Sequence, residues 1–361
     1  MDLKKLSGIA CMIAVVAIGA PCVVAADQPL PNPDGKPADM TKPVQVYILL
    51  GQSNMVGAGR ITGDKEGSLE RAVKTKKKYP YLVDDAGNWT ERKDVRYAFV
   101  MGTGGKVGKP RSNQWLTVSG MRKIGPEIGI GCYLGQAVDA PVLILKSCIG
   151  NRCLGFDLLP PGSEQFEFEE KDKKTGKTKT MVHAAYKGFG IWEKGTEPPT
   201  KGWYAGCQYD SDVAGAKMLL KSLDKYYPGA KEYEVAGFFF WQGDKDRYRA
   251  VWGDRYEVNL VNLIKALRND FNAPNAKFVC ATLGQTKKGT AGNEGKILEA
   301  QLAVSDPKKH PEFKGTVATV YTNPLSMGGA SNGHYGGNAE TYMNVGEAMG
   351  KAMADLLKNQ D

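Results

Sequence analysis

Histidine is scarce in this 361-residue sequence, in which His183, His310 and His334 are the only three. A histidine base for acid–base catalysis must therefore come from one of these positions. The sequence also lacks a Cys-x-x-Cys pair and any group of histidines near cysteines. Because zinc sites are built from those spacings, a metal site is not expected, and the chemistry considered below needs no other cofactor.

Two other kinds of ligand site are missing. The glycine-rich stretch 101–109 lacks the spacing of a phosphate-binding P-loop, because Thr103 stands where its first glycine belongs and Pro110 follows Lys109. The formal net charge is +9, but the lysines are scattered or lie in hydrophilic stretches such as 74–78, with no nucleic-acid-binding motif beside them. Nucleic acid is therefore not an expected partner.

The N-terminal 26 residues resemble a secretory signal peptide. Lys4-Lys5 precedes an apolar run over 6–20, and Val24-Ala25-Ala26 provides small residues for cleavage. The run is interrupted by Gly19 and Pro21 and is shorter than the roughly 20 residues that a membrane-spanning helix needs. The sequence predicts an exported protein, periplasmic or extracellular, without stable membrane insertion after cleavage.

Cysteine is infrequent, with seven in the chain and five after the predicted signal. Five is an odd number, so at least one thiol is unpaired within the chain. Cys132 and Cys280 have the apolar surroundings of buried thiols. Export permits a disulfide among Cys148, Cys153 and Cys207, and loop-like surroundings favour the pair Cys153–Cys207.

Short apolar runs alternate with helical patterns along the chain, which predicts an α/β fold. We expect a doubly wound, mostly parallel five-stranded sheet between helices, of the flavodoxin-like kind, in a single domain with a loop insertion. The expected strands lie at 44–50, 141–146, 235–241, 278–283 and 316–321, and the expected helices at 126–138, 212–227, 254–271 and 339–358.

Two segments interrupt this alternation. Residues 27–43 are rich in proline and polar residues and predict an extended tether before a domain that covers 44–361. The stretch of about 156–207 breaks the rhythm of strands and helices. It is either a solvated insertion with a few anchoring aromatics or a lid that shapes a sugar pocket, and composition does not choose between them.

The first apolar run ends on a serine, within Gly51-Gln52-Ser53-Asn54. A serine on the turn from a strand into a helix has its hydroxyl lifted clear of the sheet, with its own N–H directed at whatever the hydroxyl attacks. That arrangement suits the nucleophile of an esterase. The alternative is an ordinary turn in which Ser53 caps the helix.

A serine nucleophile needs a base and donors for the oxyanion that forms. His334 follows the last expected strand, so it lies at the carboxyl edge of the sheet, as Ser53 does. His183 lies in the insertion and His310 in a polar turn, which makes them weaker candidates. Gly150 follows the second expected strand, where a glycine lets the backbone approach a substrate closely.

Four segments resemble the sequence blocks of the SGNH-hydrolase superfamily. The closest branch is the sialate O-acetylesterase and acetylxylan esterase group, carbohydrate esterase family 6, and the resemblance covers about residues 44–358. The segments are Gly51-Gln52-Ser53-Asn54-Met55, Ile124-Gly125-Pro126-Glu127, Trp241-Gln242-Gly243-Asp244-Lys245-Asp246 and Gly333-His334-Tyr335.

The resemblance implies a role for each matching residue. Ser53 is the nucleophile and His334 the base, while the Ser53 N–H, Gly150 and the Gln242 side chain hold the oxyanion. The superfamily usually places an aspartate three residues before the histidine, but this sequence has Ser331 there. Asp244 or Asp246 is then expected to orient His334. Gln52, Asn54 and Asn151 are the expected substrate-binding residues.

The predicted function is that of an exported serine esterase that removes O-acetyl groups from carbohydrates, either sialate O-acetylesterase-like or acetylxylan esterase-like. Its expected partner is an acetylated carbohydrate substrate. The alternative is a non-catalytic carbohydrate-binding protein on the same fold, which the serine at position 331 motivates because a triad without its carboxylate is impaired.

Overall fold

The computed structural model describes residues 30–172 and 175–358. Its centre is a seven-stranded sheet with the strand order β12-β11-β10-β1-β6-β3-β4, in which only β4 runs antiparallel to its neighbour. The strands are β1 (Val44–Gly51), β3 (Glu91–Val100), β4 (Pro110–Thr117), β6 (Val142–Ser147), β10 (Tyr233–Trp241), β11 (Lys277–Ala281) and β12 (Val317–Val320).

The predicted α/β fold with a mostly parallel sheet is confirmed, but the sheet has seven strands where five were expected. The two additional strands are β3 and β4. β3 begins with the charged segment Glu91–Asp94 and only then continues into the apolar run 97–100, whereas β4 lies at the edge of the sheet and has Leu116 as its one buried residue. An edge strand faces solvent, so its sequence need not be apolar.

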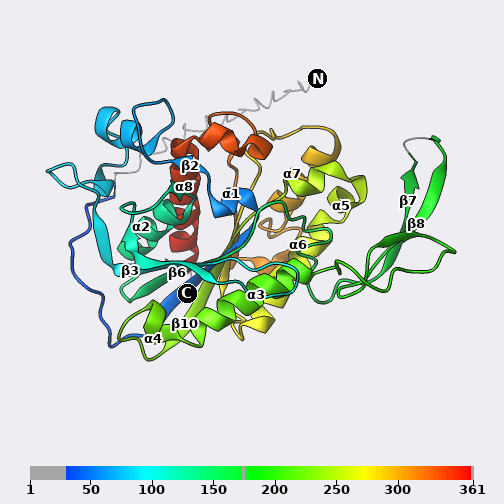
Figure 1. Ribbon diagram of the computed structural model, residues 1–361, viewed down its shortest axis with the longest axis horizontal. Helices are drawn as coiled ribbons and strands as arrows, with labels where there is room; N and C mark the ends of the chain where they lie inside the picture. Colours follow the sequence, from blue (N-terminus) through cyan, green and yellow to red (C-terminus); the bar gives the residue numbers. More distant parts are fainter. Residues whose placement is uncertain (1–29, 173–174, 359–361) are drawn as a thin grey trace, which may run out of the picture.

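Helices cover both faces of the sheet (Figure 1). α2 (Glu127–Ala137) and α8 (Ala339–Lys358) pack on one face, where Gly129 and Gly346 let the two helices approach closely. α3 (Cys207–Leu220), α6 (Tyr256–Asp270) and α7 (Gly292–Ala303) cover the other face. Both faces of β1 are buried, as continuous apolar strands of parallel sheets require.

The expected helices are present with shifted bounds. The segment predicted at 212–227 forms α3 and the short α4 (Leu223–Tyr226), and the segment predicted at 254–271 is preceded by α5 (Ala250–Asp254). The remaining short elements are α1 (Ser53–Val56), β2 (Gly59–Arg60), β5 (Lys123–Ile124), η1 (Arg71–Thr75), η2 (Pro80–Leu82), η3 (Lys245–Tyr248), η4 (Pro311–Phe313), η5 (Asn323–Leu325) and η6 (Ser331–Gly337).

The insertion is not a simple loop, because it contains a three-stranded antiparallel sheet. Its strands are β7 (Phe166–Lys171), β8 (Thr178–His183) and β9 (Ile191–Glu193), and the β7–β8 hairpin projects from one end of the molecule (Figure 1, right). His183 is fully buried at the base of the hairpin, where its ring stacks on Phe166 with centroids 4.9 Å apart. His183 is therefore a packing residue.

The predicted pair Cys153–Cys207 is wrong, because all five cysteines of the described residues are free thiols. All five are buried, including the two that were expected to be. The Cys153 Sγ instead lies 3.3 Å from Asp157 Oδ2, and Cys207 begins α3. Burial, together with the nearby carboxylates of Asp246 and Asp157, keeps the pKa of Cys153 well above its usual value.

The N-terminal predictions are only partly covered by the structure. The signal peptide at 1–26 lies outside the described residues, as do the first residues of the tether. Residues 30–43 contain neither helix nor strand, yet Leu30 packs against the core and Lys42 pairs with Asp139 at 2.6 Å. In the part of the chain that the structure describes, every helix is too short or too polar to span a bilayer.

Candidate active site

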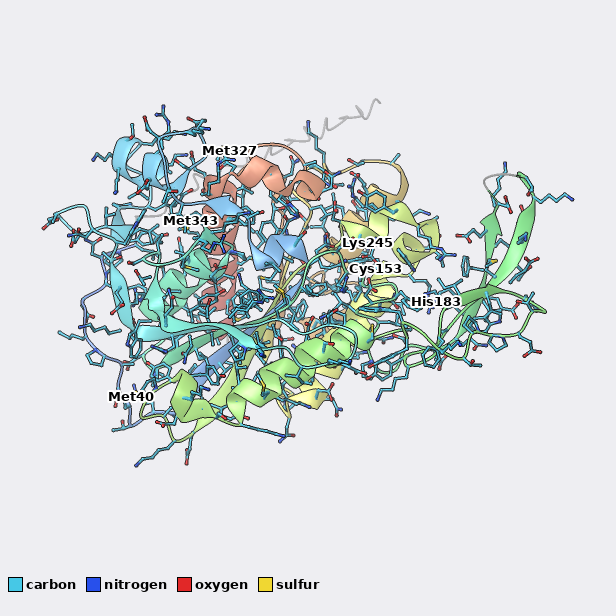
Figure 2. The ribbon with its side chains drawn as sticks, in the orientation of Figure 1. Met40, Cys153, His183, Lys245, Met327 and Met343 are labelled. Carbon is cyan, nitrogen blue, oxygen red and sulfur yellow. The ribbon has the colours of Figure 1, made fainter. Side chains whose placement is uncertain are left out.

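A cavity of about 350 Å³ opens at the carboxyl edge of the central sheet. The chain order of the strands reverses at β1, which has β6 on one side and β10 on the other. Ligands of open α/β sheets bind at such a switch point. The loops after these strands meet in the middle of the molecule, where Figure 2 labels Cys153 and Lys245. The cavity is lined by Gln52, Ser53, Gly150, Asn151, Asp244, Tyr248, Asn332 and His334.

Ser53 is the first residue of α1, directly after the turn that ends β1. Gly51 forms this turn with φ +141°, and a side chain there would meet the Trp241 carbonyl oxygen at 2.3 Å, so only glycine fits. The helix is capped by Gln52, which has extended backbone, and not by Ser53. The Ser53 N–H therefore has no acceptor inside the helix, and its hydroxyl lines the cavity.

Gly150 lies directly beside Ser53. A Cβ atom built on Gly150 would come within 3.3 Å of Ser53 Cβ and 3.7 Å of Ser53 Cα. The next residue, Asn151, also lines the cavity and has a left-handed backbone with φ +58°. The backbone after β6 thus lies close to the serine, and a side chain in place of Gly150 would press against it.

A buried ion pair between Lys146 and Glu127 contacts α1, the short helix that begins with Ser53. Lys146 Nζ lies 2.5 Å from Glu127 Oε2 and 3.0 Å from the carbonyl oxygen of Val56, the last residue of α1. The second oxygen of Glu127 accepts from the Gly125 N–H at 2.9 Å. Lys146 and Glu127 are almost completely buried. The segment 124–127, noticed in the sequence as one of the four blocks, therefore connects α2 to the nucleophile turn.

We expect Lys146→Met to lower the free energy of unfolding by about 3–5 kcal/mol, because it leaves Glu127 buried without its counter-charge. The loss is measured by urea unfolding. The double variant Lys146→Met, Glu127→Gln should recover part of it. Lys194→Met is the matched control, because its partner Glu167 lies 2.8 Å away in an exposed pair, and surface pairs contribute little. Equal effects for the buried and the exposed pair would contradict this account.

His334 enters the cavity from η6, between β12 and α8. His334 and Tyr335 both have left-handed backbone, with φ +52°. Tyr335 is fully buried and stacks on Trp241 at 5.8 Å, and its hydroxyl accepts from the Gly284 N–H at 3.1 Å. This anchor holds the turn that places His334 in the cavity that Ser53 also lines. Among residues 30–172 and 175–358, no side chain is hydrogen-bonded to the His334 ring.

Asp244 lines the same cavity and is bound by the residue that replaces the usual aspartate. Ser331 Oγ donates to Asp244 Oδ1 at 2.7 Å, and Arg247 pairs with that carboxylate at 2.9 Å. Asp244 belongs to the loop after β10, whereas Ser331 begins the segment of His334. Ser331 thus connects the segment that carries His334 to the carboxylate of Asp244.

Asp246, the other candidate carboxylate, is directed away from His334. It is fully buried and accepts hydrogen bonds from the backbone N–H groups of Leu154 at 3.0 Å and Gly155 at 2.8 Å. Burial raises its pKa to about 7, although these donors and Gln242 act in the opposite direction. Through these hydrogen bonds, Asp246 in the loop after β10 holds the loop after β6 in place.

The Gln242 side chain differs from its predicted role as an oxyanion donor. It is completely buried, and its amide nitrogen faces Gln52 Oε1 at 3.0 Å, the Arg152 carbonyl at 2.8 Å and Asp246 Oδ2 at 2.6 Å. Three acceptors surround two N–H groups, so none is left for a substrate oxygen. Gln242 is a scaffold residue beneath the cavity.

Gln52 is better placed to face a substrate. Its Oε1 accepts from Gln242 Nε2 and from the backbone N–H groups of Gly243 and Lys245, both at 3.3 Å. Because backbone N–H groups can only donate, they fix the oxygen end of the amide and leave its nitrogen for the cavity that Gln52 lines.

Asn54, predicted to bind substrate, points away from the cavity. It is 1% exposed, its Oδ1 accepts from Tyr342 at 3.4 Å, and its Nδ2 lies 3.5 Å from the Ser331 carbonyl oxygen. Because consecutive side chains of a helix point in different directions, Asn54 is buried while Ser53 lines the cavity. Asn54 therefore supports the segment that carries His334 and does not contact the cavity.

Two residues of the cavity were missed from the sequence. Tyr248 ends η3 and is 62% exposed, and Asn332 precedes His334 by two residues. The spacing of Asn332 from His334 was visible in the sequence, but asparagine beside glycine is ordinary turn chemistry. Tyr248 lies four residues after Asp244, but its exposure, which marks it as able to contact a ligand, is visible only in the structure.

A comparison with protein families identifies the chain. Residues 163–355 match the family model described as carbohydrate esterase, sialic acid-specific acetylesterase, and this match covers more than half of the chain. The protein belongs to this family. It is therefore a carboxylic ester hydrolase of the carbohydrate esterases, as the four sequence blocks predicted. The matched region contains Asp244 and His334 and begins after Ser53.

Solved structures provide similar folds at low sequence identity. A protein from Arabidopsis thaliana is 16% identical with a TM-score of 0.47, covering 88% of this chain and 99% of its own. A carbohydrate acetylesterase from Xanthomonas citri is 12% identical with a TM-score of 0.48, covering 86% of this chain and 55% of its own. NanS is 12% identical with a TM-score of 0.37, covering 77% and 78%. A comparison with curated proteins finds no match.

Proposed function

We propose that this esterase removes O-acetyl groups from sugars by serine acyl transfer, with Ser53 as nucleophile and His334 as base. The observation that carries the proposal is the cavity at the switch point, which Ser53 and His334 line together with Gly150 and Asp244. These four residues come from segments up to 281 positions apart. A nucleophile, a base and a carboxylate in one cavity are the parts of a hydrolytic triad.

In the first step, the Ser53 hydroxyl oxygen attacks the carbonyl carbon of the acetyl group while His334 takes the hydroxyl proton. The tetrahedral intermediate collapses when the bond to the sugar oxygen breaks, and His334 returns the proton to that oxygen. The acetyl group is now on Ser53. Water, deprotonated by His334, attacks the acetyl-enzyme and releases acetate, which restores both residues.

The oxyanion of both tetrahedral intermediates is held by the backbone N–H groups of Ser53 and Gly150. The close contact of Gly150 with Ser53 supports this pair. We assign the third donor to the Gln52 amide nitrogen, because the Gln242 amide is occupied by protein acceptors. Each such donor contributes on the order of 2.7–4 kcal/mol to lowering the barrier.

Asp244 acts as the positioning residue that orients the His334 ring. Its hydrogen bond from Ser331 supports this role, because Ser331 begins the segment that carries the histidine. A carboxylate in that place selects the productive tautomer and stabilises the imidazolium that forms.

We further propose that the protein is exported to the periplasm or the extracellular space. The positively charged start, the apolar run 6–20 and the small residues at 24–26 support this location. The substrates that the family description favours are O-acetylated sialic acids, and acetylated xylo-oligosaccharides are the second class to be compared.

Acetate release tests the function directly. We expect the purified protein to release acetate from 4-nitrophenyl acetate and from an O-acetylated sugar of at least one of the two classes, with acetate measured by a coupled assay. The rival function is non-catalytic binding of carbohydrate. Sugar binding by calorimetry without acetate release from any of these esters would favour that rival and contradict the esterase.

A further inference from the structure

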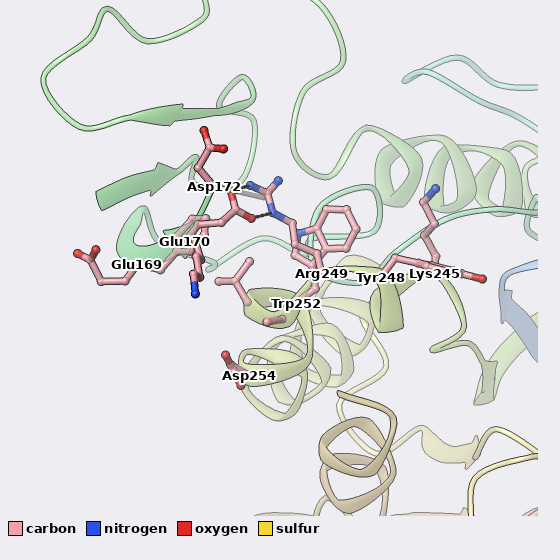
Figure 3. A pocket seen from close by; sticks show the side chains of 12 residues that line it. Glu169, Glu170, Asp172, Lys245, Tyr248, Arg249, Trp252 and Asp254 are labelled. Carbon is pink, nitrogen blue, oxygen red and sulfur yellow. Dashed lines mark hydrogen bonds and ion pairs between the residues drawn. The ribbon is translucent and has the colours of Figure 1, made fainter. Parts of the chain in front are cut away.

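A second, larger cavity of about 850 Å³ lies between the β7–β8 hairpin and the segment that leads into α5 (Figure 3). One wall is formed by β7, including Phe168 and Glu170, and the other by Tyr248, Arg249 and Trp252. Its volume is within the roughly 300–1,000 Å³ of pockets that hold organic ligands. The carboxylates and cations of its lining come from the insertion, from η3 and from the segment through α5, and none of them has a role in the proposed chemistry.

Tyr248 connects this cavity to the active site, because its side chain lines both. The tyrosine is 62% exposed, and because the Arg247 guanidinium lies 5.2 Å from the centre of its ring, the opposite face is the one left for a ligand. Lys245, which also lines the larger cavity, directly follows Asp244 of the active site. The two cavities therefore adjoin at Tyr248, which lies between Ser53 and the hairpin.

Arg249 fixes the wall of the cavity that β7 forms. Its guanidinium binds both carboxylate oxygens of Glu170, at 2.9 and 2.8 Å, which Figure 3 shows as two dashed lines across the cavity. The same guanidinium lies 5.6 Å from the centre of the Phe168 ring and 5.8 Å from that of Trp252. Arg249 thus fixes the hairpin to the body, so the cavity exists before a ligand enters it.

The chemistry of the lining matches a sugar chain. A sugar ring presents C–H groups on its faces and hydroxyl groups at its edge, so it fits aromatic faces bordered by planar charged groups. The lining also lacks an excess of positive charge. Its four carboxylates are Glu169, Glu170, Asp172 and Asp254, and its three cations are Lys171, Lys245 and Arg249. This balance disfavours a polyanionic glycan.

We propose that the cavity between the hairpin and α5 is a subsite for the neutral sugar residues next to the acetylated one. The enzyme then acts on acetylated oligosaccharide or polysaccharide chains in preference to single sugars. This inference rests on the proposed function for its kinetic part, because the chain enters the subsite past Tyr248 from the ester at Ser53.

The kinetic test compares kcat/KM for an O-acetylated neutral tetrasaccharide with that for the O-acetylated monosaccharide of the same sugar. We expect the wild type to prefer the tetrasaccharide at least tenfold. Ala250→Trp should remove this preference, because Ala250 is exposed at the start of α5 and an indole there fills the cavity. Ala86→Trp, in an exposed turn before β3, is the control and should keep the wild-type ratio.

A binding test separates the subsite from the chemistry. The Ser53→Ala protein is titrated with the unacetylated neutral tetrasaccharide and with an oligosialic acid of the same length, using calorimetry. We expect the neutral chain to bind at least tenfold more tightly and both Ala250→Trp and Tyr248→Ala to weaken it. Urea unfolding verifies that each variant is folded.

Several outcomes would overturn the subsite. These are equal kcat/KM for the two substrates, a ratio that Ala250→Trp leaves unchanged, or tighter binding of oligosialic acid. If the wild type releases no acetate from any ester, the proposed function fails instead, while the titration still decides whether the cavity binds neutral chains.

Discussion

Ser53→Ala is expected to lower kcat for acetate release by at least about 10⁴-fold, because no other hydroxyl takes the place of the lost nucleophile and only binding and oxyanion contacts remain. The serine is held at the start of α1 by a turn that requires Gly51, so the substitution removes one oxygen atom and leaves the turn intact. The loss is measured with 4-nitrophenyl acetate and with the preferred acetylated sugar.

Two controls make this result specific. Ser119→Ala removes a hydroxyl from an exposed turn outside the cavity and should keep wild-type kcat. Urea unfolding of Ser53→Ala should give the wild-type midpoint, which separates loss of chemistry from loss of fold. Turnover by the folded Ser53→Ala protein within tenfold of the wild type would refute Ser53 as nucleophile.

Asp244→Asn is expected to lower kcat by roughly 10³- to 10⁴-fold with little change in KM, because an amide in this place no longer stabilises the imidazolium or selects its tautomer. The geometry behind this expectation is the bond of 2.7 Å from Ser331 to Asp244 and the presence of Asp244 and His334 in one cavity. Steady-state kinetics on the acetylated sugar gives kcat and KM separately.

Moving the carboxylate from position 244 to position 331 tests whether Asp244 positions His334 or has only a structural role. Ser331 stands three residues before His334, so Ser331→Asp puts an aspartate at the position that SGNH enzymes usually use. We expect the double variant Asp244→Asn, Ser331→Asp to regain at least about tenfold in kcat over Asp244→Asn alone, since one carboxylate replaces the other. A structural role for Asp244 predicts no such rescue, so kcat equal to that of the single variant would rule out the positioning role.

The strands could be predicted from the sequence wherever both faces of the sheet are covered. Residues 44–50 and 235–241 are continuous apolar runs, and they form β1 and β10 because every side chain in the interior of such strands is buried. The same rule did not find β4, whose edge position allows charged and polar side chains, or β3, which is buried over 95–100 but begins with the charged segment 91–94 and contains Arg96. Apolar content therefore predicts burial, and it predicts strands only where strands are buried.

The insertion shows a second limit of local patterns. Alternating residues in β7, such as Phe166-Glu167-Phe168-Glu169, were present in the sequence but were interpreted as part of a loop insertion. The hairpin is stabilised by contacts that the local sequence does not contain, since Arg249 binds Glu170 from 79 residues away and Arg255 lies 4.7 Å over the Phe166 ring. Whether this alternation forms a strand depends on those partners.

By itself the sequence determined the candidates for chemistry. A serine after a buried strand, few histidines and a glycine after the next central strand identify Ser53, His334 and Gly150, because apolar runs and turn residues place them at one edge of the sheet. Sequence motifs also determined the family to which the chain belongs, which the match over residues 163–355 confirms.

Only the tertiary structure decided how the polar residues divide their roles. Asp244 and Asp246 are two positions apart in the same block, yet one binds Ser331, 87 residues away, and the other binds the backbone of Leu154, 92 residues away. Gln242 is likewise occupied by acceptors that lie far from it in the chain. The physical reason is that a hydrogen bond depends on the approach of two atoms to about 3 Å, which local sequence does not encode.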